Sequence, residues 1–181
     1  MDYFIELLFS GLSRGAIYAL IALGYTMVYG IIGLINFAHG EIYMIGAFTS
    51  FIIATILTIL GFPALAIIVL AGLAAVIWSA SYGYTIEKIA YKPLRHAPRL
   101  SALISAIGMS MFLQNYVLLA QTSDFLPFPQ LIPDFEFMEP IAHIVGSSDM
   151  VILVVTTVVM ICLTILIKYT RIGKAMRATS Q

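Results

Sequence analysis

The sequence predicts an all-α protein, a polytopic bundle of about five transmembrane helices. Of its 181 residues 61% are hydrophobic and only 10% are charged, and the mean hydropathy is +1.03. Soluble domains are typically about 45–50% apolar and about 25% charged, so this chain has too little polar surface to cover a water-soluble globule. Long uncharged runs carry the excess, at residues 15–38, 42–86, 100–123 and 150–167. Roughly 20 apolar residues cross a hydrocarbon core about 30 Å thick, so the run 42–86 must cross twice.

We expect helices in these runs, because in lipid an isolated strand would leave its backbone groups unpaired. The run 42–86 is divided by Gly61, Phe62 and Pro63, a turn signal in which proline denies the helix a hydrogen-bond donor. An apolar stretch at residues 4–12 is a candidate backward extension of the first segment. The expected segments are residues 15–37, 42–60, 64–86, 100–120 and 150–167.

Basic residues set the expected orientation. Eight of the nine Lys and Arg residues lie within residues 88–99 and 168–177, which places the loop 88–99 and the later stretch in the cytoplasm. Residues 121–149 contain five acidic residues and no Lys or Arg, so we expect this loop to be extracytoplasmic. We treat residues 1–181 as a single transmembrane domain. Parity puts the N-terminus outside, but this orientation stays open because residues 36–41 could be a break within the membrane.

Composition also excludes several kinds of function. The formal net charge is zero, so we expect no basic face for nucleic acid; membrane lipid is the expected surrounding. The single cysteine, Cys162, lies in an apolar run and permits neither an intrachain disulfide nor a zinc cluster. We find no phosphate-binding loop, no HExxH and no GxSxG. The expectation is a protein that is not an enzyme, with no catalytic residue, cofactor or metal site.

Asn36, His39 and Glu41 form the most unusual stretch, an amide, an imidazole and a carboxylate within six residues between two apolar runs. A charge at bilayer depth is costly, so such residues usually face a cavity or a partner. One interpretation is a broken helix that lines a translocation path, as in transporters with discontinuous helices. The alternative is an interfacial turn with Glu41 at a helix start, where the helix dipole favours its charge.

Other polar residues inside the runs are further candidates for a path. Tyr25 and Tyr29 lie at helical spacing in the first segment, and Ser105, Gln114 and Asn115 lie in the fourth. Their hydroxyls and amides could line a conduit for a polar solute. Helix–helix packing is the commoner use of such residues in bundles and the interpretation we prefer for them.

The expected outer loop combines acidic residues with several phenylalanines. Asp134, Glu136 and Glu139 are candidates for docking another protein, because an acidic surface with aromatic anchors suits such contacts. A solvated loop folded on the membrane surface is the alternative.

Several long strings carry a family resemblance. They are YALIALGYTMVYGIIG at 18–33, INFAHGE at 35–41, AYKPLR at 90–95, ALISAIGMS at 102–110 and FLQNYV at 112–117. With them the chain closely resembles the LivH-type permeases of bacterial branched-chain amino acid ABC transporters. The similarity covers nearly the whole chain except the outer loop.

The resemblance implies a heteromeric importer in the bacterial inner membrane. Its expected partners are a homologous second permease subunit, cytoplasmic ATP-binding subunits that hydrolyse ATP, and a periplasmic binding protein that delivers leucine, isoleucine or valine. It also implies that residues 168–181 begin the cytoplasmic segment that engages the ATPase. The coupling residues are then Arg171, Gly173, Lys174 and Arg177. Because the match ends at Gln181, we expect later membrane helices to be missing and this chain alone to be transport-incompetent.

The expected function is therefore that of a permease subunit for ATP-driven uptake of branched-chain amino acids. A permease for urea or short amides in the same family is the first alternative. An ion-coupled carrier or channel is the second, and a membrane scaffold without transport is the third. Ion-driven carriers often rely on ionisable groups within their spans, and here only His39 and Glu41 approach that description, which favours translocation powered by a separate subunit.

Overall fold

The computed structural model describes residues 2–33, 36–94, 97–122, 124, 126–129, 131 and 146–179. These residues form six α-helices and no strand, and five of the helices are long and apolar enough to cross a membrane. The predicted fold class is therefore confirmed. The chain forms two compact units, one of Met1–Gly33 with Ile132–Gln181 and one of Leu34–Leu131, and each is described here by itself.

The first unit contains α1 (Asp2–Ile32), α5 (Ser147–Tyr169) and α6 (Arg171–Thr179), and α1 packs against both α5 and α6. The expected backward extension over residues 4–12 is helical. The predicted end of the first segment at residue 37 was wrong, since α1 ends at Ile32. Gly33 adopts φ +68° and its N–H donates to the Tyr29 carbonyl at 2.8 Å. This left-handed conformation ends the helix at a residue that has no side chain to oppose it.

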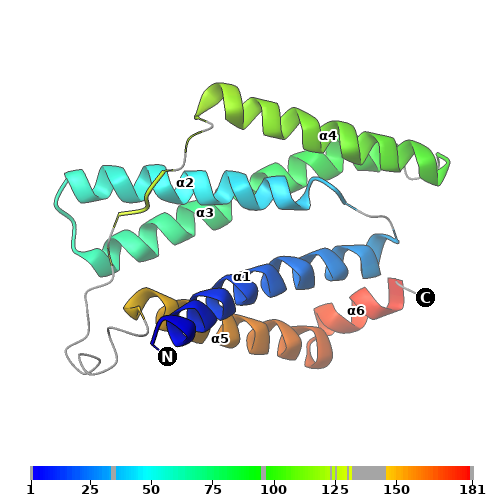
Figure 1. The fold of residues 1–181 in the computed structure, drawn as a ribbon. Helices are drawn as coiled ribbons and strands as arrows, with labels where there is room; N and C mark the ends of the chain where they lie inside the picture. Colours follow the sequence, from blue (N-terminus) through cyan, green and yellow to red (C-terminus); the bar gives the residue numbers. More distant parts are fainter. Residues whose placement is uncertain are drawn as a thin grey trace. The chain divides into compact units, whose positions relative to one another are not determined.

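Helices α1 and α5 run in the same direction (Figure 1). Ser13, which is only 1% exposed, donates from Oγ to Oδ1 of Asp149 in the first turn of α5 at 2.6 Å. At the other end α6, which follows α5, also contacts α1. Parallel spanning helices cross a membrane in the same sense. The cytoplasmic location of the basic stretch after α5 stays a prediction, and on that prediction α1 would start outside.

The second unit is built on an antiparallel hairpin of α2 (His39–Ile59) and α3 (Ala64–Ile86). The turn between them is a Schellman motif: Phe62 N–H donates to Leu57 O and Gly61 N–H to Thr58 O, each at 3.1 Å. Gly61 has φ +76°, as this motif requires. The turn predicted at residues 61–63 is confirmed, and α3 has the predicted bounds.

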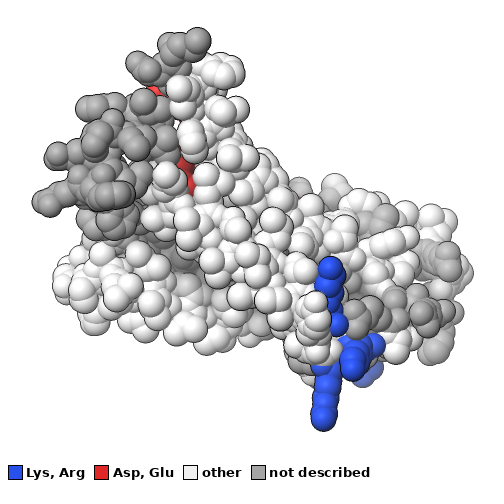
Figure 2. Space-filling view, turned by 90° about the horizontal axis from the view of Figure 1, so that it is seen from below, with Lys and Arg blue, Asp and Glu red and all other residues white. Residues whose placement is uncertain are grey.

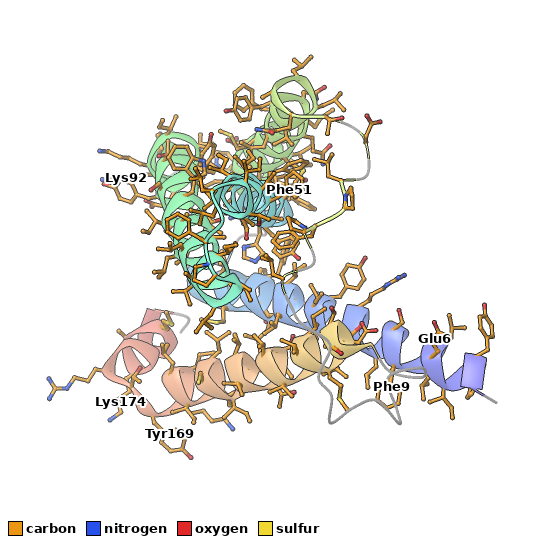
Figure 3. The ribbon with its side chains drawn as sticks, turned by 90° about the vertical axis from the view of Figure 1, so that its left-hand side faces the viewer. Glu6, Phe9, Phe51, Lys92, Tyr169 and Lys174 are labelled. Carbon is orange, nitrogen blue, oxygen red and sulfur yellow. The ribbon has the colours of Figure 1, made fainter. Side chains whose placement is uncertain are left out.

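The expected cytoplasmic loop at 88–99 begins as helix rather than as loop. A π-helical turn, η1 (Glu87–Tyr91), and a 3-10 turn, η2 (Lys92–Leu94), continue α3. Pro93 has no N–H and its ring would clash with a carbonyl four residues earlier. The α-helical hydrogen-bond pattern therefore changes before it, and Lys92 N–H donates five residues back, to Glu87 O. Lys92 projects away from this turn (Figure 3).

Helix α4 (Arg99–Ala120) completes the second unit. Its buried Leu113 and Val117 join Ile45 of α2 and Ile86 of α3 in one apolar cluster. After α4 the chain returns along α2, where the rings of Phe128 and Phe51 meet edge to face with centroids 6.2 Å apart.

Most helix surface is exposed and apolar. Only 6–22% of each candidate span is buried within the described structure. On the face shown in Figure 2, residues other than Lys, Arg, Asp and Glu make up almost the whole described surface, and the visible basic side chains are confined to one small area. Such a surface suits contact with lipid tails or with further apolar helices.

Gly46 sets the close approach of α2 and α3, because a Cβ at this position would run into Ser79 Oγ. We expect Gly46→Leu to lower the free energy of unfolding by about 1–3 kcal/mol through overpacking. Gly72→Leu is the matched control, since a Cβ there meets nothing within 4 Å. Unfolding by SDS titration in mixed micelles, followed by circular dichroism, measures both. Equal stability of the two variants would contradict the packing described.

Candidate functional site

A polar cluster in the second unit joins α2 to α4. Ser110 Oγ and Gln114 Nε2, one helical turn apart on α4, both donate to Glu41 Oε1, at 2.9 and 2.7 Å. Glu41 lies in the first turn of α2 and is half-buried. Glu41 and Gln114 are path candidates from the sequence, 73 residues apart, and the structure brings them together.

The position of the cluster along α4 can be related to the basic residues of the second unit. Ser110 is 11 residues after Arg99 on α4, which corresponds to about 16 Å along the helix. However, Ser105, five residues before Ser110, contacts Ala90 between Lys88 and Lys92, so along α4 the cluster is only about 8 Å from the level of these basic residues. The break within the membrane at the start of α2 therefore stays a prediction, as does the interfacial turn.

Asn36 holds that start of α2 in place. Its Oδ1 accepts from the Ala38 N–H at 3.0 Å and from the Tyr91 hydroxyl at 2.6 Å, and its carbonyl accepts from the His39 N–H at 3.1 Å. Ala38 is completely buried. Asn36, expected as a path residue, therefore has a structural use here, fixing the turn to η1, and His39 is half-buried at the first position of α2.

Two more path candidates of the second unit, Ser105 and Asn115, make hydrogen bonds of their own. Ser105 Oγ donates to Ala90 O at 3.5 Å, and Asn115 Nδ2 donates to Met111 O of its own helix at 2.8 Å. Tyr25, half-buried, and Tyr29, which is 52% exposed, belong to α1 in the first unit.

An apolar groove of about 540 Å³ lies between α2, α3 and α4 in the second unit. Its walls include Ile45, Ala74, Trp78 and Tyr116, with the Gln121 amide after the end of α4. Ile45 follows Glu41 by one helical turn, so the groove begins beside the polar cluster. Sequence reasoning missed this groove, because its walls are ordinary apolar residues from three helices.

The expected coupling residues lie at the turn from α5 into α6. Thr170 caps α6, its Oγ1 accepting from the Gly173 N–H at 3.2 Å. Gly173 is buried, and a Cβ there would collide with the Ile167 carbonyl oxygen of α5. Arg171 and Lys174 are exposed, and Lys174 projects from α6 (Figure 3). The side chain of Arg177 lies outside the described side chains.

The predicted docking residues, Asp134, Glu136 and Glu139, lie outside the described residues. Within the part of the chain that is described, no three His, Cys, Asp or Glu side chains are grouped so as to hold a metal ion. The arrangement has other uses: a carboxylate beside an apolar groove can meet a cationic group that carries an apolar tail.

Five helices that are long and apolar enough to cross a membrane define a multi-pass integral membrane protein, and one of them carries a hydrogen-bonded carboxylate. Over residues 7–181 the chain matches the family model described as branched-chain amino acid transport system / permease component. The chain belongs to this family, and the family resemblance is confirmed.

Individual relatives agree with the family match. The chain is 47% identical over 190 residues to the high-affinity branched-chain amino acid transport system permease protein LivH of Salmonella typhimurium, covering 99% of this chain and 59% of that protein. It is 46% identical over 183 residues to LivH of Escherichia coli K12, with the same coverage. It is 48% identical over 183 residues to the corresponding permease protein BraD of Pseudomonas aeruginosa, covering 99% of the chain and 60% of BraD. The chain thus spans about 60% of the length of these relatives, and no solved structure matches it.

Proposed function

We propose that this chain is the membrane permease part of an ATP-driven importer of branched-chain amino acids in the bacterial inner membrane. The observation that carries the proposal is the identity of 46–48% over 99% of the chain to permeases named for high-affinity branched-chain amino acid transport. Identity at this level over continuous membrane segments favours branched-chain amino acids over urea or short amides as the cargo.

The proposed partners follow from the description of the family as one component of a transport system. We expect a homologous permease subunit beside this one, ATP-binding subunits at α6, and a periplasmic amino-acid-binding protein at the acidic outer loop. The exposed basic residues of α6, Arg171 and Lys174, support a cytoplasmic protein contact at that helix. The chain itself hydrolyses nothing in this scheme.

The proposed path uses alternating access between an outward and an inward state. Polar groups at the ends of helices meet the charged ends of the zwitterion, while apolar surface accepts its side chain. Glu41, Ser110 and Gln114 are the polar groups that support this assignment, since all three meet within the span region.

The test is uptake of labelled leucine by bacteria that lack the permease gene, with and without complementation by the permease at the full length of its relatives. We expect complementation to restore uptake, ATP depletion to abolish it, and a proton ionophore at clamped ATP to spare it. If leucine uptake were lost with the ionophore alone, an ion-coupled carrier would replace the proposed ATP-driven importer. If urea or short amides were taken up and leucine were not, they would replace branched-chain amino acids as the proposed cargo.

A further inference from the structure

The polar cluster and the apolar groove adjoin in a way that suits one class of molecule. Among the described residues, both hydrogen bonds to Glu41 reach Oε1 and none reaches Oε2. Ser110 and Gln114 therefore orient the carboxylate without saturating it. Glu41 belongs to a candidate membrane span, where a carboxylate is costly unless a partner cation or further donors meet it.

The groove extends away from this carboxylate along α2. Its walls begin at Ile45, one turn or about 6 Å beyond Glu41, and continue along Phe48 and Ile52. In leucine the ammonium nitrogen and the terminal methyl groups are separated by four bonds, about 5 Å when extended. The two separations match, so one small molecule can reach both features.

The size and lining of the groove also suit a small ligand. Its volume of about 540 Å³ is within the usual range for ligand pockets, about 300–1,000 Å³. The lining is apolar apart from a few hydroxyl and amide groups. Thr49, one of these, already donates its hydroxyl proton to Ile45 O at 2.8 Å, which leaves the wall near Glu41 apolar.

We propose that Glu41 binds the α-ammonium group of the transported amino acid and that the groove between α2, α3 and α4 receives its aliphatic side chain. The groove then contributes to the choice among leucine, isoleucine and valine within the permease itself. This proposal rests on the proposed function and assigns its substrate contacts.

The first test is Glu41→Gln in the complete transporter, reconstituted in proteoliposomes with its binding protein. Glutamine keeps a side-chain oxygen that can accept from Ser110 and Gln114, so helix packing is retained while the charge is lost. We expect leucine uptake to fall about 10- to 100-fold, the range for losing a hydrogen bond to a charged group. ATP hydrolysis stimulated by the loaded binding protein is expected to persist. Uptake within twofold of the parent protein would overturn the ammonium assignment.

The second test fills the groove. Ala74→Leu on α3 adds bulk to its wall, and Ala80→Leu, an exposed position on the same helix outside the groove, is the matched control. We expect Ala74→Leu to lower leucine uptake relative to valine uptake about tenfold, as for a changed methylene fit in a hydrophobic pocket. The control should leave this ratio unchanged. The same binding protein serves all variants, so a changed ratio originates in the permease.

Three results would count against the side-chain assignment or its premise. An unchanged leucine-to-valine ratio in Ala74→Leu overturns it. Loss of assembly with Ala74→Leu but not with Ala80→Leu also overturns it, because the groove would then be covered by protein. Failure of the parent transporter to move any branched-chain amino acid overturns the proposed function instead, which keeps the two failures distinguishable.

Discussion

Replacing Gly173 with valine is expected to reduce ATP-driven uptake more than tenfold while α1 and α5 remain in the membrane. The reason is steric: a Cβ at residue 173 would collide with the Ile167 carbonyl oxygen, and it would lie 2.5 Å from the Ile167 carbonyl carbon and 2.7 Å from the Leu166 oxygen. These are backbone atoms at the end of α5, so no side-chain rotation relieves the contact. Overpacking of this kind typically costs about 1–3 kcal/mol, which is enough to displace a nine-residue helix from its place.

The measurement combines leucine uptake with recovery of the ATP-binding subunits on the purified permease. Ala178→Val is the control, because residue 178 is exposed on the same helix. We expect the control to retain uptake and assembly, and Gly173→Val to lose both. Normal uptake by Gly173→Val would show that the close α5–α6 turn is not needed for coupling.

The second large effect is expected at Asn36. Asn36→Ala removes the oxygen that accepts from the Ala38 N–H and from the Tyr91 hydroxyl. Loss of each bond costs about 1–3 kcal/mol, so we expect the free energy of unfolding to fall by about 2–6 kcal/mol. Tyr91→Phe removes one of the two bonds and is expected to cost about 1 kcal/mol.

A double-mutant cycle on Asn36 and Tyr91 isolates their contact. We expect the combined variant to be more stable than the sum of the single effects indicates, by about 0.5–3 kcal/mol, as for residues in contact. Unfolding in mixed micelles, followed by circular dichroism, gives each value. Additive effects would mean that the Tyr91–Asn36 hydrogen bond contributes nothing to holding the start of α2.

The helices themselves were largely predictable from composition. The segment 64–86 was predicted with its observed bounds. It is an uncharged run between a Gly-Phe-Pro turn and Glu87, and in lipid such a run must form a helix to pair its backbone groups. The structure of the next segment was not predicted. Lys88 and Lys92 indicated a loop, yet the backbone stays helical to Leu94 because its hydrogen-bond pattern changes before Pro93. Charge determines where a chain leaves the membrane, and it does not require the helix to end there.

At the end of α1 the helix is shorter than predicted, not longer. Apolar residues continue past Gly33, so hydropathy extended the predicted segment to residue 37. The helix stops at Ile32 because Gly33 turns left-handed. A single glycine in an apolar run gives a weak signal, since glycine is also common inside membrane helices.

Glu41 was identifiable as a candidate site residue because a carboxylate next to a long apolar run is rare and costly. Its donors were harder to assign. Packing was the preferred interpretation of Gln114, and nothing in helical periodicity relates Gln114 or Ser110 to a residue about 70 positions earlier. The groove beside them has no sequence signature, because three helices supply its walls.

The sequence by itself determined that the surrounding solvent is lipid, the number of candidate spans and the family, because these depend on local hydropathy and residue identity. The tertiary structure decided which polar groups meet. It also decided that α1 runs parallel to α5 through Ser13 and Asp149, and that Gly173 packs against a carbonyl. The physical reason is the distance along the chain over which each effect operates. The hydropathy of a segment depends on that segment alone, whereas a hydrogen bond or a close backbone approach between segments forms only when packing brings them together.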